Sequence, residues 1–180
     1  MFFNRLMSLS CLGGDKAAST SSDCDCDEMV SNEPVILNIY DLVDINMYTM
    51  PLGLGVFHSG IQLYDTEYCY SGHSYSFTGI FEIQPCDGQA TLGEHCRYRE
   101  SVLLGYTHFS SEEVQRIVEQ LGLLYTGHCY HLIRNNCNHF SNSLAKILCN
   151  RGIPRWVNRL AHFVACVPFL ERCLDRQLTG

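Results

Sequence analysis

One cysteine of this chain stands where a sequence can make a thiol reactive. Cys137 lies in the run NNCNHF at positions 135–140, at the start of a predicted helix. The unpaired N–H groups and positive dipole at a helix start stabilise a thiolate, lower its pKa and can donate to an oxyanion. Asn136 or Asn135 is a natural N-cap, because an Asn side chain accepts from the first helical N–H groups. Most cysteines pack in a core instead, and that interpretation of Cys137 stays open.

A nucleophilic cysteine needs a base, and His58 is the best placed histidine. On a predicted strand at 56–63, His58 shares a face with small and polar residues, and Gly60 leaves room beside it. His139 follows Cys137 by two positions, and such residues point about 200° apart on a helix. His131 precedes the helix and remains a rival. Since strand histidines are mostly structural, His58 is a hypothesis at this point.

The 11 cysteines and 8 histidines also suggest two other roles, as ligands of a zinc site or as partners in disulfide bonds. No C-x-x-C pair occurs, and the densest Cys/His cluster, at 128–139, matches no common zinc spacing, so we predict neither metal nor cofactor. An odd number of cysteines cannot all pair within one chain, and Arg5 makes the N-terminus a weak signal peptide. We therefore expect free thiols in a reducing compartment, with the cytoplasm as default and the nucleus also open.

Charge and hydropathy argue against two classes of partner. Twelve Lys and Arg stand against 19 Asp and Glu, for a net charge of −7, which does not favour nucleic acid. The longest uncharged apolar stretch, at 160–170, is shorter than the roughly 20 residues of a membrane span. A basic helix within 151–176 could lie on a membrane surface, but such helices more often pack on their own domain. Membrane contact is therefore not favoured.

The elements that must position these residues are strands followed by helices. We expect strands at 35–40, 56–63, 67–70, 79–83 and 101–105, with a turn at 64–66. Ser110 and Glu113 form a capping box that begins one helix, a second runs from Cys137 until Gly152 and Pro154 stop it, and a third spans 156–174. This order predicts an α+β domain.

The ends of the chain differ from its middle. Residues 1–33 are Ser-rich and carry six acids against two cations, which predicts a flexible acidic tail. We place one domain at 34–174 and a short C-terminal tail at 175–180.

Two segments together carry a resemblance to a known family. GVFHSGI at 55–61 and YHLIRNNCNHF at 130–140 resemble the PPPDE, or desumoylating isopeptidase, family of permuted papain-fold cysteine peptidases. The likeness continues through GIFEI at 79–83 and IPRWVNRL at 153–160, and covers about 34–174. It implies a circularly permuted papain-like fold with a small antiparallel sheet and the catalytic cysteine at a helix N-terminus. The histidine and cysteine of the family's dyad fall on His58 and Cys137.

The resemblance also implies a reaction and its partners. Such an enzyme removes SUMO or ubiquitin from lysine of conjugated proteins through an acyl-cysteine intermediate. His58 would keep Cys137 as a thiolate and later protonate the leaving amine. Candidates for a second oxyanion donor or for orienting His58 are Asn135, Asn138 and Tyr40. Backbone for a Gly-Gly groove could come from Gly53, Gly55 and Gly72.

Other readings of the same dyad stay open. The pattern Asn-Cys-x-His-Phe also resembles lecithin:retinol acyltransferase-like enzymes, so a protein S-acyl thioesterase or a lipid acyltransferase is an alternative. A non-catalytic ubiquitin- or SUMO-binding module, with Cys137 kept for packing, is another. A homodimeric assembly is another open alternative, because members of the family can form dimers. Neither the identity of the modifier nor that of the target proteins follows from the sequence.

Overall fold

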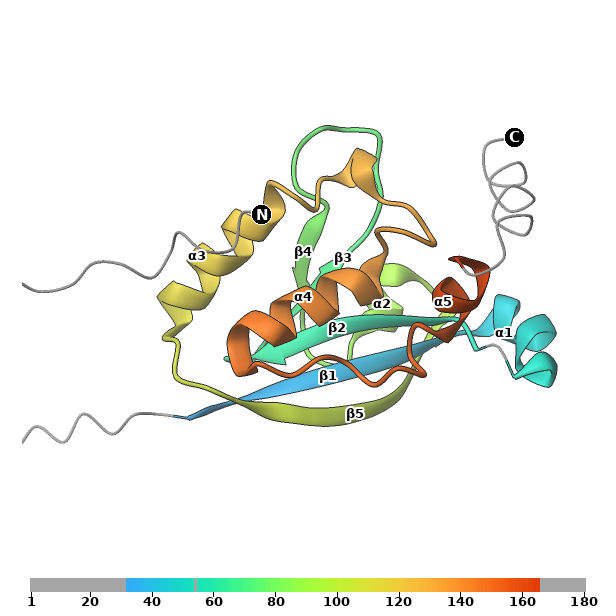
Figure 1. Cartoon of the computed structure of the whole chain (residues 1–180), viewed down its shortest axis with the longest axis horizontal. Coiled ribbons are helices and arrows are strands. Elements are labelled where there is room, and N and C mark those ends of the chain that lie inside the picture. The colour runs from blue at the N-terminus through green and yellow to red at the C-terminus, as the bar shows by residue number, and fades with distance from the viewer. Residues whose placement is uncertain (1–31, 54, 166–180) are drawn as a thin grey trace, which may run out of the picture.

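A five-stranded antiparallel sheet forms the frame of the molecule in this computed structural model, which describes residues 32–53 and 55–165 (Figure 1). The strands lie in the order β4-β3-β2-β1-β5. Their bounds are β1 Glu33–Leu42, β2 Phe57–Leu63, β3 Thr66–Tyr70, β4 Ile80–Ile83 and β5 Cys96–Thr107. The described helices are α1 Val43–Thr49, α2 Gly88–Leu92, α3 Ser111–Gly122, α4 Cys137–Cys149 and α5 Arg159–Ala165, with 3-10 turns at Met50–Leu52 and Gly127–Cys129. None of these helices is long and apolar enough to cross a membrane.

The core lies between one face of the sheet and the helices α3 and α4. Branched residues alternate along β1, and Val35, Leu37 and Ile39 are fully buried on this face. From α4, Phe140 and Leu144 fill the same core without exposure. Every second residue of β1 and residues four apart on α4 thus supply the apolar side chains that pack against each other in the core.

Helix α4 lies across β2 (Figure 1) and is tied to it by buried polar groups. Ser59 on β2 donates its hydroxyl to the side-chain oxygen of Asn138 at 2.7 Å, and Ser141 donates to the Ser59 carbonyl at 3.1 Å. These bonds satisfy polar groups that would otherwise be buried at a cost. They fix the start of α4 against the first half of β2.

Most of the predicted elements are present with shifted ends. The five strands are confirmed, and so is the capping box of Ser110 and Glu113. Strand β5 is longer than expected, since its first half is largely exposed and polar. Helix α4 ends at Cys149 with Asn150 in the left-handed conformation, so Gly152 is not its cap. The short helices α1 and α2 were not predicted.

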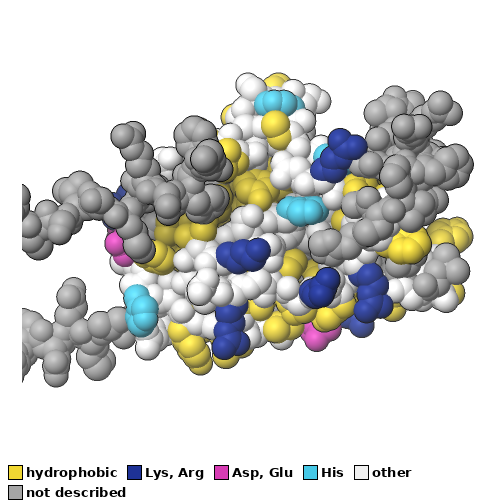
Figure 2. Space-filling view, viewed as in Figure 1, with side chains coloured by type: hydrophobic (Ala, Val, Ile, Leu, Met, Phe, Trp, Pro, Cys, Tyr) yellow, Lys and Arg dark blue, Asp and Glu magenta, His cyan; other side chains and the backbone are white. Residues whose placement is uncertain are grey.

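The predicted domain limits fall largely outside the described residues. Most of the tail at 1–33, the C-terminal tail at 175–180 and the last part of the helix at 156–174 lie there, so these limits remain predictions. Within the described part of the basic segment, Arg151, Arg155 and Arg159 are exposed. Figure 2 shows Lys and Arg side chains spread across the face on which α4 lies.

Candidate active site

Cys137 is the first residue of α4, as the sequence predicts, and Asn136 is the N-cap. The Asn136 side chain accepts from the His139 N–H at 3.0 Å, and His139 Nδ1 accepts from the Asn136 N–H at 3.2 Å. Asn136 also donates to the Leu132 carbonyl at 2.7 Å. This capping box holds the cysteine at the end of the helix where N–H groups are free.

The thiol of Cys137 is buried against β2. It is 4% exposed, and Sγ lies 4.0 Å from the Phe57 carbonyl oxygen. Burial raises the pKa of the thiol, while hydrogen bonds from the Ser59 and Asn138 backbone N–H groups and from the Tyr130 hydroxyl oppose that rise. The expected lowering of this pKa at the helix start is therefore wrong for the free protein, because desolvation outweighs the donors.

Cys137 still differs from the other described cysteines, all of which are free thiols. Burial raises the pKa of Cys69 and Cys96, the latter to about 12, and nearby negative charge at Glu67 raises both further. Neither has a donor that lowers it. Cys137 is thus the buried thiol with groups arranged to stabilise its thiolate.

His58 lies near the start of β2, where its partner across the strands is Tyr40. The two rings are 6.0 Å apart between centroids, and His58 is 7% exposed. Its Nε2 is buried without a hydrogen-bond partner in the described structure. Burial lowers the pKa of His58 from 6.5 to about 4, so the imidazole is neutral at pH 7 and can accept a proton.

The structure brings His58 and Cys137 to one narrow cleft of about 50 Å³. The start of β2, the start of α4, Tyr130 and the residues Leu160 and Ala161 of α5 form its walls. Among the hydrogen bonds of the described residues, none joins the side chains of His58 and Cys137. Such bonds are often absent before substrate binds and form in the complex.

The electrostatics of the cleft favour a neutral pair. With the His58 pKa near 4 and the Cys137 pKa above its usual value, the proton resides on sulfur at pH 7. This differs from the expectation that His58 keeps a thiolate at rest. The neutral imidazole can take the thiol proton only during attack, when charge develops on both groups together.

The two rival histidines lie elsewhere. His139 is part of the capping box and lines a separate hollow with Pro154. His131 Nδ1 accepts from the N–H groups of Ile133 and Arg134, at 3.2 and 3.3 Å. Neither lines the cleft that contains Cys137.

The other residues that the sequence suggested for the site do not all line the cleft. Asn138 lines the cleft, but its amide donates to the Phe57 carbonyl at 3.0 Å. Asn135 donates to the Cys129 carbonyl at 3.0 Å and does not line the cleft. Gly53, Gly55 and Gly72 do not line it either, although a Cβ at Gly72 would lie 3.0 Å from Tyr130. Glycine thus lets that loop pack tightly on the tyrosine.

Two contributors to the site were not predicted from the sequence. Tyr130 hydrogen-bonds the Cys137 thiol, and burial raises the pKa of its own hydroxyl. Glu67 on β3 is fully buried and accepts from the Tyr40 hydroxyl at 2.8 Å and from the Asn38 amide at 2.6 Å. It forms no ion pair with a described residue. Because a buried carboxylate needs donors, these bonds hold Tyr40 beside His58.

The space that we expected beside His58 is occupied by this carboxylate. A Cβ at Gly60 would clash with Glu67 Oε1, so the glycine is required by the close approach of Glu67. Tyr40, a candidate for orienting His58, contacts it through its ring while its hydroxyl binds Glu67.

Comparison with known proteins agrees with the resemblance seen in the motifs. The chain is 43% identical over 143 residues to a protein named desumoylating isopeptidase 1 homolog from Caenorhabditis elegans, which is 79% of this chain and 42% of that protein. It is 41% identical over 148 residues to a DeSI-like protein from Arabidopsis thaliana, covering 79% of this chain and 64% of that one. Human desumoylating isopeptidase 1 is 31% identical over 144 residues, 76% of this chain and 79% of its own length.

The chain thus spans less than two thirds of the worm and plant relatives. Residues 33–178 match the family described as "PPPDE putative peptidase domain". That match extends over most of the chain and includes both motif segments. The chain therefore belongs to the PPPDE peptidase family.

Proposed function

We propose that this protein is a cysteine isopeptidase that removes SUMO or ubiquitin from lysine side chains of conjugated proteins. The observation that carries the proposal is one narrow cleft that contains a thiol at a helix N-terminus and a neutral imidazole whose Nε2 has no hydrogen-bond partner among the described residues. The relatives named desumoylating isopeptidase support the substrate class and favour SUMO as the first modifier to test.

The histidine strand β2 precedes the cysteine helix α4 in the chain. That order, together with the antiparallel sheet, supports a permuted papain-like fold as part of the proposal. The dyad of His58 and Cys137 belongs to the proposal as well.

The first half of the reaction forms an acyl-cysteine. His58 takes the thiol proton as Cys137 Sγ attacks the carbonyl carbon of the modifier's C-terminal residue. The N–H of Cys137, at the first position of α4, donates to the oxyanion that forms. The imidazolium then gives its proton to the lysine nitrogen as the C–N bond breaks, and the amine leaves. The Tyr130 hydroxyl stabilises the negative charge that develops on Cys137 Sγ during the attack.

The second half hydrolyses the thioester. Neutral His58 takes a proton from a water molecule, whose oxygen attacks the acyl carbon. The C–S bond breaks, the proton returns to sulfur, and the modifier leaves with a free C-terminal carboxylate. Burial lowers the pKa of His58 to about 4, so the imidazole is neutral at pH 7 and can accept a proton.

Cleavage of purified conjugates tests the proposal. Wild-type protein should release SUMO or ubiquitin from a lysine-linked conjugate, and Cys137→Ala and His58→Ala should lose at least about a hundredfold in kcat/KM. Cys129→Ala, which removes an exposed thiol, should retain full activity. Intact conjugates together with release of fatty acyl chains from S-acylated proteins would show a thioesterase instead.

A further inference from the structure

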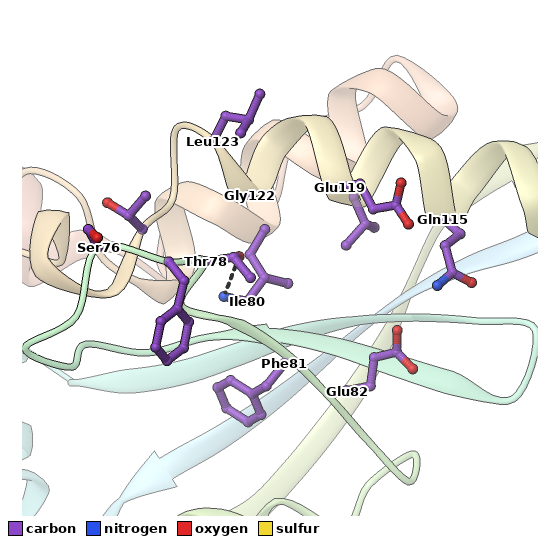
Figure 3. Close-up of a pocket in the computed structure, with 12 residues that line it drawn as sticks. Ser76, Thr78, Ile80, Phe81, Glu82, Gln115, Glu119, Gly122 and Leu123 are labelled. Atoms are coloured by element: carbon purple, nitrogen blue, oxygen red, sulfur yellow. Dashed lines mark hydrogen bonds between the residues drawn. The ribbon is translucent and has the colours of Figure 1, made fainter.

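A larger hollow lies away from the catalytic cleft, between α3 and the edge strand β4. It encloses about 590 Å³, far more than the cleft. Figure 3 shows its two sides, with Gln115 and Glu119 on α3 above Ile80 and Glu82 on β4. Helix α3 packs into the core through Val114 and Leu121, and the groove lies along the adjoining flank of the helix, with Val118 at the border between the two.

The groove combines apolar and acidic groups. Ile80 and Val118 contribute partly buried apolar surface, and at one end Phe77 and Leu123 are 61% and 73% exposed. Exposed apolar side chains gathered at a groove are typical of a binding surface. The ionisable residues lining it are Glu82 and Glu119, with no Lys, Arg or His among its described lining.

The two carboxylates set the charge of an acceptable partner. Neither Glu82 nor Glu119 forms an ion pair with a described residue. An apolar partner surface alone would take them out of water without compensation, which is costly. A partner with Lys or Arg beside an apolar side chain supplies both the contact and the counter-charge.

One loop, at 71–79, links the groove to a wall of the catalytic cleft. At the groove end, Thr78 pairs with Thr126. In the middle, the His73 N–H donates to the Gly127 carbonyl at 3.2 Å. At the other end Gly72 packs on Tyr130, which lines the cleft and hydrogen-bonds Cys137.

We propose that this groove binds the folded domain of the modifier, through an apolar side chain flanked by Lys or Arg, while the modifier's C-terminal tail reaches Cys137. This inference rests on the proposed function. An isopeptidase meets many target proteins, but every conjugate shares the modifier. A fixed site outside the cleft therefore serves all substrates only if it recognises that shared part.

Charge reversal in the groove tests the inference. The double variant E82K/E119K should raise KM for a SUMO or ubiquitin conjugate by about tenfold or more, because cationic partners are now repelled. It should leave cleavage of a short fluorogenic peptide ending in Gly-Gly within twofold, since that substrate reaches only the cleft. The matched control D87K/E94K changes net charge equally at exposed positions that flank α2, where neither carboxylate forms an ion pair with a described residue, and should leave both substrates unaffected.

Binding without turnover separates this inference from the proposed function. Free SUMO and free ubiquitin are titrated against Cys137→Ala protein, with and without E82K/E119K. One of them should bind, and the groove variant should weaken that binding by about tenfold. Equal binding with and without the groove substitutions, or binding of neither modifier, overturns the docking site. Wild-type protein that binds a modifier through the groove but cleaves neither conjugate nor peptide overturns the isopeptidase and keeps the docking site.

Discussion

Acidification should destabilise this protein through His58 by an amount that the structure sets. The unfolded chain protonates this histidine near pH 6.5, whereas burial lowers its pKa in the folded state to about 4. Between these values the unfolded state binds one proton more, so the free energy of unfolding falls as pH falls. The contribution is fully present above pH 6.5 and is lost by about pH 4.

The magnitude follows from the width of this window. At 1.36 kcal/mol for each pH unit, the difference between 6.5 and about 4 corresponds to about 3 kcal/mol. That is a large part of the roughly 5–15 kcal/mol that stabilises a typical domain. His58 is buried and has no partner on Nε2 in the described structure, so no hydrogen bond offsets the cost of charging it.

Urea unfolding from pH 4 to pH 8 measures the effect when wild type is compared with His58→Gln. Other titrating groups are common to both proteins, so the difference between the two curves isolates the histidine. Wild type should lose about 3 kcal/mol more than the variant between pH 7 and pH 4. Parallel curves would refute the reasoning, because they would mean that His58 titrates near its ordinary pKa and is not desolvated.

Three further experiments test other contacts of the site. Tyr130→Phe removes a donor to the Cys137 thiol and should slow alkylation of that thiol by iodoacetamide at pH 8 about tenfold; an unchanged rate would mean that the donor does not stabilise the thiolate. Asn136→Ala removes the N-cap of α4 and should lower the free energy of unfolding in urea by about 1–2 kcal/mol; a loss below about 0.3 kcal/mol would contradict the capping box. Glu67→Gln and Tyr40→Phe should each destabilise the fold, and a double-mutant cycle should give a coupling of about 1 kcal/mol or more, whereas additive losses would show that the bond between them contributes nothing.

The start of the cysteine helix could be predicted because its cause is local. Asn136 caps the helix three residues before His139, so a short stretch of sequence contains the whole signal for placing Cys137 at the first turn. The strands behaved similarly, since alternation in β1 and the turn at 64–66 are short-range patterns. Strand β5 was underestimated where exposed polar residues replace that alternation.

The environment of His58 and Cys137 could not be predicted because it arises from long-range packing. Glu67 reaches the His58 region through the pairing of β2 with β3, and its sequence neighbours suggest an ordinary hairpin strand. Whether the pKa of Cys137 is raised or lowered depends on how deeply its thiol is buried between α4 and β2. Capping residues reveal the donors at a helix start, but only the tertiary structure determines the burial that opposes them.

Labelling with an electrophilic probe tests the central claim most directly. SUMO and ubiquitin that carry a C-terminal electrophile are incubated with the protein, and the modified residue is mapped by mass spectrometry. We expect a single covalent adduct on Cys137, no adduct with Cys137→Ala and strongly slowed labelling of His58→Ala. No adduct with either probe, or equal labelling of the Cys137→Ala protein, would contradict a cysteine isopeptidase that acts through this thiol.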